Sequence, residues 1–260
     1  TIFATDDGVH LNGTTFNGGL TNTGTISSGS EAIIIDTATF NGGINNSGRL
    51  AGDTGLEVNS TNFNGGFLNT GHVDGASYGA YFNVTNWANG NLSNSGTIEA
   101  GAATGLYVSA TSFTGDIVNS GTIQSAGSTA VEIAVSNFTG GFTNSGLIQG
   151  DTSGVYFNST DMSGNFVNSG TIVTNESTGI YIGSSTINGV LTNSGLIQSA
   201  TEDGIVVTGG HVAGGITNSG TIIASAAAID VSSADTGHNI TLAGGVVVGE
   251  YADVPADARP

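Results

Sequence analysis

The sequence contains no cysteine, no lysine, only two arginines and two prolines, and no apolar run of membrane-spanning length. Without cysteine the chain can form neither disulfides nor metal–thiolate sites. Arg49 and Arg259 stand against 20 acidic residues, which gives a net charge of −18. Cationic side chains are needed to displace counterions from nucleic acids and to bind anionic bilayers. We therefore expect no nucleic-acid partner and no membrane insertion of this segment.

What the chain has instead is glycine and apolar residues. It contains 44 glycines, 37% hydrophobic residues and 8% charged residues. The chain therefore has enough apolar residues to form a packed core, and disorder is not expected. The glycines do not recur at every third position, which excludes collagen. Thr1 begins inside a repeat. We expect a processed or excised piece of a longer precursor.

The tripeptide Asn-Ser/Thr-Gly recurs through the chain at steps of 23 to 25 residues. Its nine copies start at Asn22, Asn46, Asn69, Asn94, Asn119, Asn144, Asn168, Asn193 and Asn218. A constant period of this length is typical of solenoids, in which each repeat is one turn that is stable only when stacked on its neighbours.

Apolar residues keep fixed, even offsets from each Asn, which is the period of a strand with one buried face. Offset −2 is apolar in all nine copies, as in Leu20 and Ile44, and offset +4 is apolar as well, as in Ile26 and Leu50. Offset −6 is a large apolar residue, and Trp87 is displaced there by one position with a compensating insertion. A third segment, ten to fourteen residues after the Asn, reads Gly-apolar-x-apolar.

This pattern predicts an all-β fold: a parallel β-solenoid, expected to be right-handed, of ten to eleven rungs of 23–25 residues. We assign one domain to residues 1–249 and a C-terminal exit segment or linker to residues 250–260. Thr1-Ile2 align with a partial first rung, and Leu242 stands in the Asn place of the last. At about 4.8 Å per rung the rod would be roughly 50 Å long.

The nine asparagines fall in phase with the buried positions, so we predict that they form a structural ladder of amide hydrogen bonds from rung to rung. We expect the Gly two residues after each Asn to adopt a positive-φ corner. Under this interpretation the tripeptide is architectural and is not a ligand or glycan site.

The Asn-Ser/Thr-Gly-x-Ile corners and Phe-x-Gly-x-Leu strands, from about Thr1 to Gly249, resemble the β-helical passenger regions of bacterial autotransporters and related type V secreted surface proteins. The resemblance implies an extracellular or bacterial cell-surface location. It also implies an N-terminal secretion signal and a C-terminal membrane barrel. Such passengers include adhesins, proteases and esterases. No Gly-x-Ser-x-Gly motif occurs here, and we expect no enzyme activity and no catalytic residues.

Carboxylates and histidines offer few candidate sites. Asp74 and Glu99 lie five residues after their Asn on adjacent rungs, a spacing that would suit a retaining glycosidase or a shared calcium ion. Glutamines occupy the same position further along, which favours a solvated outward column. The histidines, His10, His72, His211 and His238, have different offsets, so we expect no histidine metal site. We expect no cofactor and no metal, with calcium as the alternative.

Four of the six tyrosines occupy the middle of the third segment, on its outer face: Tyr81, Tyr107, Tyr156 and Tyr181. They could simply pack against one another along the sheet. They could also form a contact face, because an aromatic ring with a polar tip suits a sugar or another protein. The sequence leaves both interpretations open.

We expect an extracellular structural protein, a subunit of a cell-surface or matrix fibre or adhesin stalk. The expected partners are the chain itself, by head-to-tail or lateral association, and glycans or host and matrix surfaces. Ile2-Phe3 and Val246-Val247-Val248 lie near the two ends, where an uncapped stack could bind a second copy. The alternative is a carbohydrate-binding or carbohydrate-cleaving β-helix protein.

Overall fold

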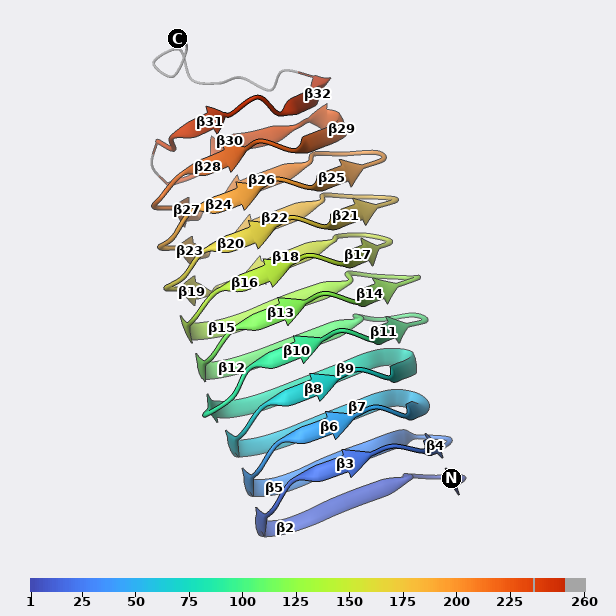
Figure 1. Ribbon diagram of the computed structural model, residues 1–260. Helices are drawn as coiled ribbons and strands as arrows, with labels where there is room; N and C mark the ends of the chain where they lie inside the picture. Colours follow the sequence, from blue (N-terminus) through green and yellow to red (C-terminus); the bar gives the residue numbers. More distant parts are fainter. Residues whose placement is uncertain (236, 251–260) are drawn as a thin grey trace.

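The computed structural model describes residues 1–235 and 237–250, and these form a parallel β-solenoid without helices. Figure 1 shows flattened rungs stacked in chain order from β2 at one end to β32 at the other. Every strand pair runs parallel, because each rung lies directly on the one before it. The predicted all-β solenoid is confirmed.

One side of each rung is a three-residue strand that ends at the repeated Asn, and these strands form a ten-stranded sheet. They are β3 (Leu20–Asn22), β6 (Ile44–Asn46), β8 (Phe67–Asn69), β10 (Leu92–Asn94), β13 (Ile117–Asn119), β16 (Phe142–Asn144), β20 (Phe166–Asn168), β24 (Leu191–Asn193), β28 (Ile216–Asn218) and β31 (Ile240–Leu242).

The remaining strands form one 22-stranded sheet. Its first half contains β1 (Ile2–Phe3), β2 (Val9–Asn17), β4 (Thr25–Ser27), β5 (Glu31–Asn41), β7 (Arg49–Asn64), β9 (His72–Ala88), β11 (Thr97–Ala100), β12 (Leu106–Thr114), β14 (Thr122–Ser125) and β15 (Val131–Thr139). Its second half contains β17 (Leu147–Gly150), β18 (Val155–Asn158), β19 (Asp161–Met162), β21 (Thr171–Thr174), β22 (Ile180–Gly183), β23 (Thr186–Ile187), β25 (Leu196–Ser199), β26 (Ile205–Thr208), β27 (His211–Val212), β29 (Thr221–Ala227), β30 (Ile229–Ser233) and β32 (Val246–Glu250).

The strand register follows the sequence repeat. Asn119 pairs with Asn94 and Asn144, and Leu242 takes the Asn place opposite Asn218, as predicted. Trp87 pairs with Phe63 and Phe113 on its two sides, so the insertion after it restores the register. Ile2 pairs with Ile26, which makes the first residues a partial rung. Residues 251–260 of the expected exit segment lie outside the described residues.

The core is a set of columns that run along the rod axis. The residues at offsets −6, −2 and +4 point inward, and from Ile44 to Ile216 those at offset −2 are at most 1% exposed. Aromatic rings stack along the offset −6 column: Phe16 lies 5.2 Å from Phe40, Phe63 4.6 Å from Trp87, and Trp87 4.8 Å from Phe113. Each inward column buries apolar surface that a single rung could not cover.

The long strands of the first rungs are broken into shorter ones in the second half. Ser159, Ser184 and Gly209 occupy equivalent positions in three successive rungs and have φ of 53°, 48° and 54°. A left-handed residue cannot continue a strand, so β18, β22 and β26 end here and β19, β23 and β27 follow as separate strands. This break is a local bend in an otherwise unchanged rung.

The expectation that the Gly two residues after each Asn adopts positive φ is wrong. None of these glycines has positive φ; it falls instead on several glycines four residues before the Asn, such as Gly140 at 151°. The glycine after the Asn is required by stacking: a Cβ on Gly121 would lie 2.0 Å from the carbonyl oxygen of Gly96 in the preceding rung. Any larger residue would push neighbouring rungs apart.

Candidate functional site

The nine asparagines form the predicted ladder inside the solenoid. The side-chain nitrogen of each donates to the side-chain oxygen of the Asn in the next rung, at 2.7–2.8 Å in all eight steps from Asn22 to Asn218. All nine side chains are buried, and that of Asn119 is 0% exposed. The ladder continues without a break through the register change at Trp87.

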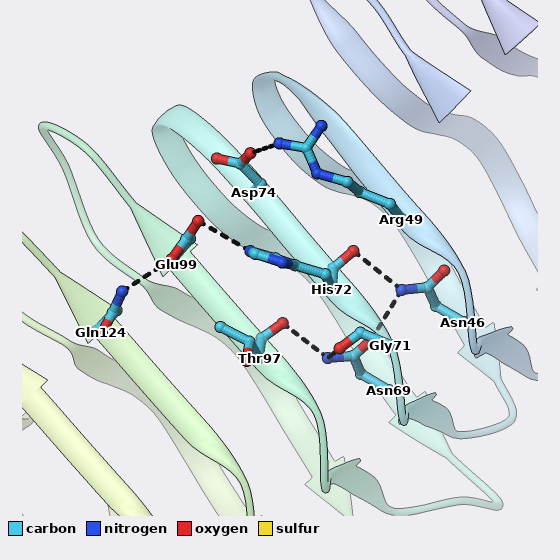
Figure 2. A network of polar contacts seen from close by, with 9 residues as sticks. All are labelled: Asn46, Arg49, Asn69, Gly71, His72, Asp74, Thr97, Glu99 and Gln124. Atoms are coloured by element: carbon cyan, nitrogen blue, oxygen red, sulfur yellow. Dashed lines mark hydrogen bonds and ion pairs between the residues drawn. The ribbon is translucent and has the colours of Figure 1, made fainter. Parts of the chain in front are cut away.

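Each ladder amide also holds the corner of its own rung. Asn69 Nδ2 donates to the carbonyl oxygens of Gly71, at 3.4 Å, and of Thr97, at 3.0 Å. Figure 2 shows these bonds and the bond from Asn46 Nδ2 to the carbonyl oxygen of His72, which corresponds to that from Asn69 to Thr97. Buried amides with their hydrogen-bonding groups engaged stabilise the chain and offer nothing to a ligand. The asparagines are therefore a structural element.

The four predicted tyrosines lie in one outward column but form two groups. Tyr81 and Tyr107 stack with ring centroids 4.9 Å apart and planes 9° apart, and Tyr156 meets Tyr181 edge to face at 5.1 Å. Glu132 pairs with Tyr107 on one side and Tyr156 on the other, and so separates the two groups.

Tyr78 is a fifth member that the repeat pattern missed. Its ring lies 5.1 Å from that of Tyr81 and 6.4 Å from that of Tyr107. A residue three positions away on a regular strand would face the other side, but β9 is irregular here, because the adjacent residues Gly79 and Ala80 are both buried. We call Tyr78, Tyr81, Tyr107, Tyr156 and Tyr181 the tyrosine face.

Burial among these rings changes the acid–base behaviour of the column. It raises the pKa of Tyr81, Tyr107 and Tyr156 above the ordinary 10.0, with a further contribution from neighbouring tyrosines or Glu132. Desolvation also raises the pKa of Glu132, and a hydrogen bond from Asn158 opposes that shift. Burial therefore disfavours ionisation of Tyr81, Tyr107 and Tyr156.

An open groove of about 610 Å³ runs beside the tyrosine face. Its rim includes Asp36, Asn59, Asn83 and Ser109, and the last three lie two residues after Glu57, Tyr81 and Tyr107 on the same strands. Side chains two residues apart on a strand point to the same face. Asn59 Nδ2 already donates to Asp36 at 3.1 Å and to Glu57 at 2.6 Å. The groove therefore places amide and carboxylate groups beside stacked aromatic rings.

Asp74 and Glu99 pair directly across β9 and β11, as the spacing predicted. They are not free carboxylates. Arg49 forms an ion pair with Asp74, and Gln124 Nε2 donates to Glu99 at 2.8 Å. Figure 2 shows two separate sets of contacts across successive rungs: Arg49 with Asp74, and His72 with Glu99 and Gln124. Asp74 and Glu99 therefore each have a partner, and neither is available as a free catalytic acid or base.

Several histidines make contacts that their offsets from the Asn do not indicate. His72 Nε2 lies 2.8 Å from Glu99 Oε1, and one ligand atom each of His72, Asp74 and Glu99 lie within 4.8 Å of one another. The rings of His211 and His238 lie 5.0 Å apart. Offsets counted from the Asn hide the contact between His72 and Glu99, because residues at offsets +3 and +5 share one outward face.

Among the described residues, no helix is long and apolar enough to cross a membrane. No protein-family model matches the chain, and no curated protein or solved structure is significantly similar to it.

Proposed function

We propose that the chain is an extracellular structural protein of the bacterial cell surface, a stalk or fibre subunit that carries an adhesive tyrosine face. The observation that carries the proposal is the combination of a buried amide ladder from Asn22 to Asn218 with an aromatic column and a polar groove on the outside of the rod. The inside supplies rigidity, and the outside supplies the contact.

Rigidity follows from the rung-to-rung bonding. Each rung is joined to the next by two parallel sheets, by one ladder hydrogen bond and by stacked core side chains. A local opening must break all three together, which makes it costly. The low content of lysine and arginine also leaves few sites for trypsin-like proteases. Both properties suit a protein that works outside the cell.

The tyrosine face with its groove suits a glycan as the adhesive ligand. Tyrosine rings stack on the apolar faces of sugars, and amide or carboxylate groups at the rim hydrogen-bond hydroxyls. Asn83 and Ser109 at the groove provide such groups next to Tyr81 and Tyr107. The ligand would lie along the rod axis and span several rungs.

The test is binding of the chain to a panel of bacterial and algal polysaccharides. In the variant, Tyr81, Tyr107, Tyr156 and Tyr181 are all replaced by Ser. We expect the variant to fold and to lose at least tenfold in affinity, because both pairs of rings are gone and only Tyr78 of the tyrosine face remains.

The matched control replaces outward apolar residues of the ten-stranded sheet, Leu68, Val118 and Val167, by Ser. This control should bind like the original chain. Equal binding by the tyrosine variant, or equal loss in the control, would contradict the proposal. Release of reducing ends from any polysaccharide would favour the alternative, a carbohydrate-cleaving β-helix.

Self-association is the second part of the proposal. The end rungs expose apolar side chains: Phe3 is 81% exposed, and Leu242 and Val246 are 57% and 54% exposed. Open strand edges with exposed apolar residues favour pairing with another strand in register. Sedimentation over a range of concentrations tests it. A single monomeric species at all concentrations would remove self-association from the proposal and leave the adhesive face untouched.

A further inference from the structure

We propose that His72, Asp74 and Glu99 form a binding site for a divalent transition metal ion of the zinc class. The site lies on the outside of the solenoid, at the beginning of β9 and β11. It is separate from the tyrosine face, and it does not depend on the proposed function.

The strand geometry brings the three ligands together. His72 and Asp74 are two residues apart on β9 and therefore share its outer face. Glu99 on β11 pairs directly with Asp74. Neighbouring strands lie about 4.8 Å apart, so the three side chains rise from one small area of rigid sheet. The backbone needs no rearrangement to present them.

The ligand atoms are close to a coordinating arrangement. They all lie within 4.8 Å of one another, and the closest pair, His72 Nε2 and Glu99 Oε1, is 2.8 Å apart. Tetrahedral bonds of about 2.1 Å place two ligand atoms about 3.4 Å apart. Side-chain rotations suffice for this change, since His72 is 38% and Glu99 29% exposed.

The donor set selects the kind of metal. Calcium and magnesium take oxygen ligands almost exclusively, whereas imidazole favours zinc, copper and nickel. One imidazole and two carboxylates leave the fourth tetrahedral position open to water or to a group of another molecule. The net charge of −18 also favours the approach of cations to the surface.

Arg49 already places a cationic group against one of the proposed ligands, Asp74. Its guanidinium pairs with Asp74 from the preceding rung, as Figure 2 shows. The sequence contains two basic residues of the Lys/Arg type in all. A metal ion bound to Asp74 would compete with Arg49 for the same carboxylate. Removing the guanidinium should therefore strengthen metal binding, which a purely structural network would not predict.

His10 provides a matched control within the same chain. Its Nδ1 lies 3.2 Å from Asp7 and its Nε2 3.1 Å from Asp36. The two carboxylates approach different nitrogens of the ring, so they cannot bind one metal ion together with either nitrogen. Like the proposed site, this group has one histidine and two carboxylates, but its ligand atoms do not converge.

The test is calorimetric titration of the whole chain with zinc chloride, repeated with excess calcium. We expect one zinc ion per chain, undisturbed by calcium. His72→Ala and Glu99→Gln should each lower the affinity at least tenfold, His10→Ala should leave it unchanged, and Arg49→Gln should raise it. Circular dichroism checks that each variant is folded. A cobalt titration gives a second readout, because tetrahedral cobalt has a visible absorption band that should be absent in His72→Ala.

Three results would overturn the proposal. The first is no zinc binding by the original chain. The second is equal affinity in His72→Ala, which would indicate nonspecific binding to surface carboxylates. The third is weaker binding in Arg49→Gln, because the guanidinium would then not be a competitor of the metal.

Discussion

Replacing Asn119 by Ala removes one step from the middle of the ladder. Asn119 accepts a hydrogen bond from Asn94 and donates one to Asn144, both at 2.8 Å, and its side chain is 0% exposed. The change leaves Asn144 Oδ1 buried without its Asn119 donor and leaves Asn94 Nδ2 with only its carbonyl partners. An unsatisfied buried acceptor, a lost hydrogen bond and a small cavity together cost about 3 to 5 kcal/mol of the free energy of unfolding.

Denaturant unfolding, followed by the fluorescence of the single tryptophan, measures this cost. Trp87 is 1% exposed and packs against Phe113 near the altered rung. The matched control is Asn137→Ala, which makes the same change at an exposed position of β15 and should cost less than about 0.5 kcal/mol. If both variants lose the same free energy, the ladder does not contribute to stability and the reasoning fails.

Three further predictions concern single positions. Gly121→Ala should prevent or strongly destabilise folding because its Cβ would clash with the Gly96 carbonyl, whereas Gly237→Ala, with nothing within 4 Å, should melt like the original chain. Glu132→Gln should raise the melting temperature at neutral pH, and this gain should disappear on acidification. Burial raises the pKa of Glu132, so the folded state is favoured when the carboxyl is protonated and loses that stability as the pH rises through the folded pKa. A gain that persists in acid would contradict this. Absorbance titration should show that Tyr107 ionises with a pKa above its ordinary value of 10.0, because burial raises it. The stability linked to this raised pKa should be lost as the pH rises through it. A pKa of 10.0 or below would refute burial of Tyr107 as a cause.

The rung could be predicted from the sequence because its information is local and repeated. Period-2 apolar offsets identify the buried columns, and the Asn falls in phase with them. The register followed even where the pattern is irregular: Trp87 pairs with Phe63 despite its displacement, and Leu242 replaces the ladder Asn opposite Asn218. Nine copies of one pattern average out the errors of any single copy.

The features that could not be predicted from the sequence arise from contacts between rungs and from single irregular positions. The role of Gly121 could not be read from its own rung, because the contact that demands glycine is the Gly96 carbonyl 25 residues earlier. Tyr78 joins the tyrosine face because the inward–outward alternation of β9 is interrupted at Gly79 and Ala80, which the repeat pattern does not show. His72 and Glu99 have different offsets and meet only because their side chains reach across the strand spacing.

Hydrogen exchange of the asparagine side-chain amides, followed by nuclear magnetic resonance after transfer to heavy water, tests most directly that the repeated Asn is a buried ladder. If the ladder is buried, its side-chain amide signals persist long after that of the exposed Asn137 has disappeared. Disappearance of all asparagine side-chain signals together would contradict it. In that case the repeated tripeptide would face solvent, and the scaffold described above would not exist in solution.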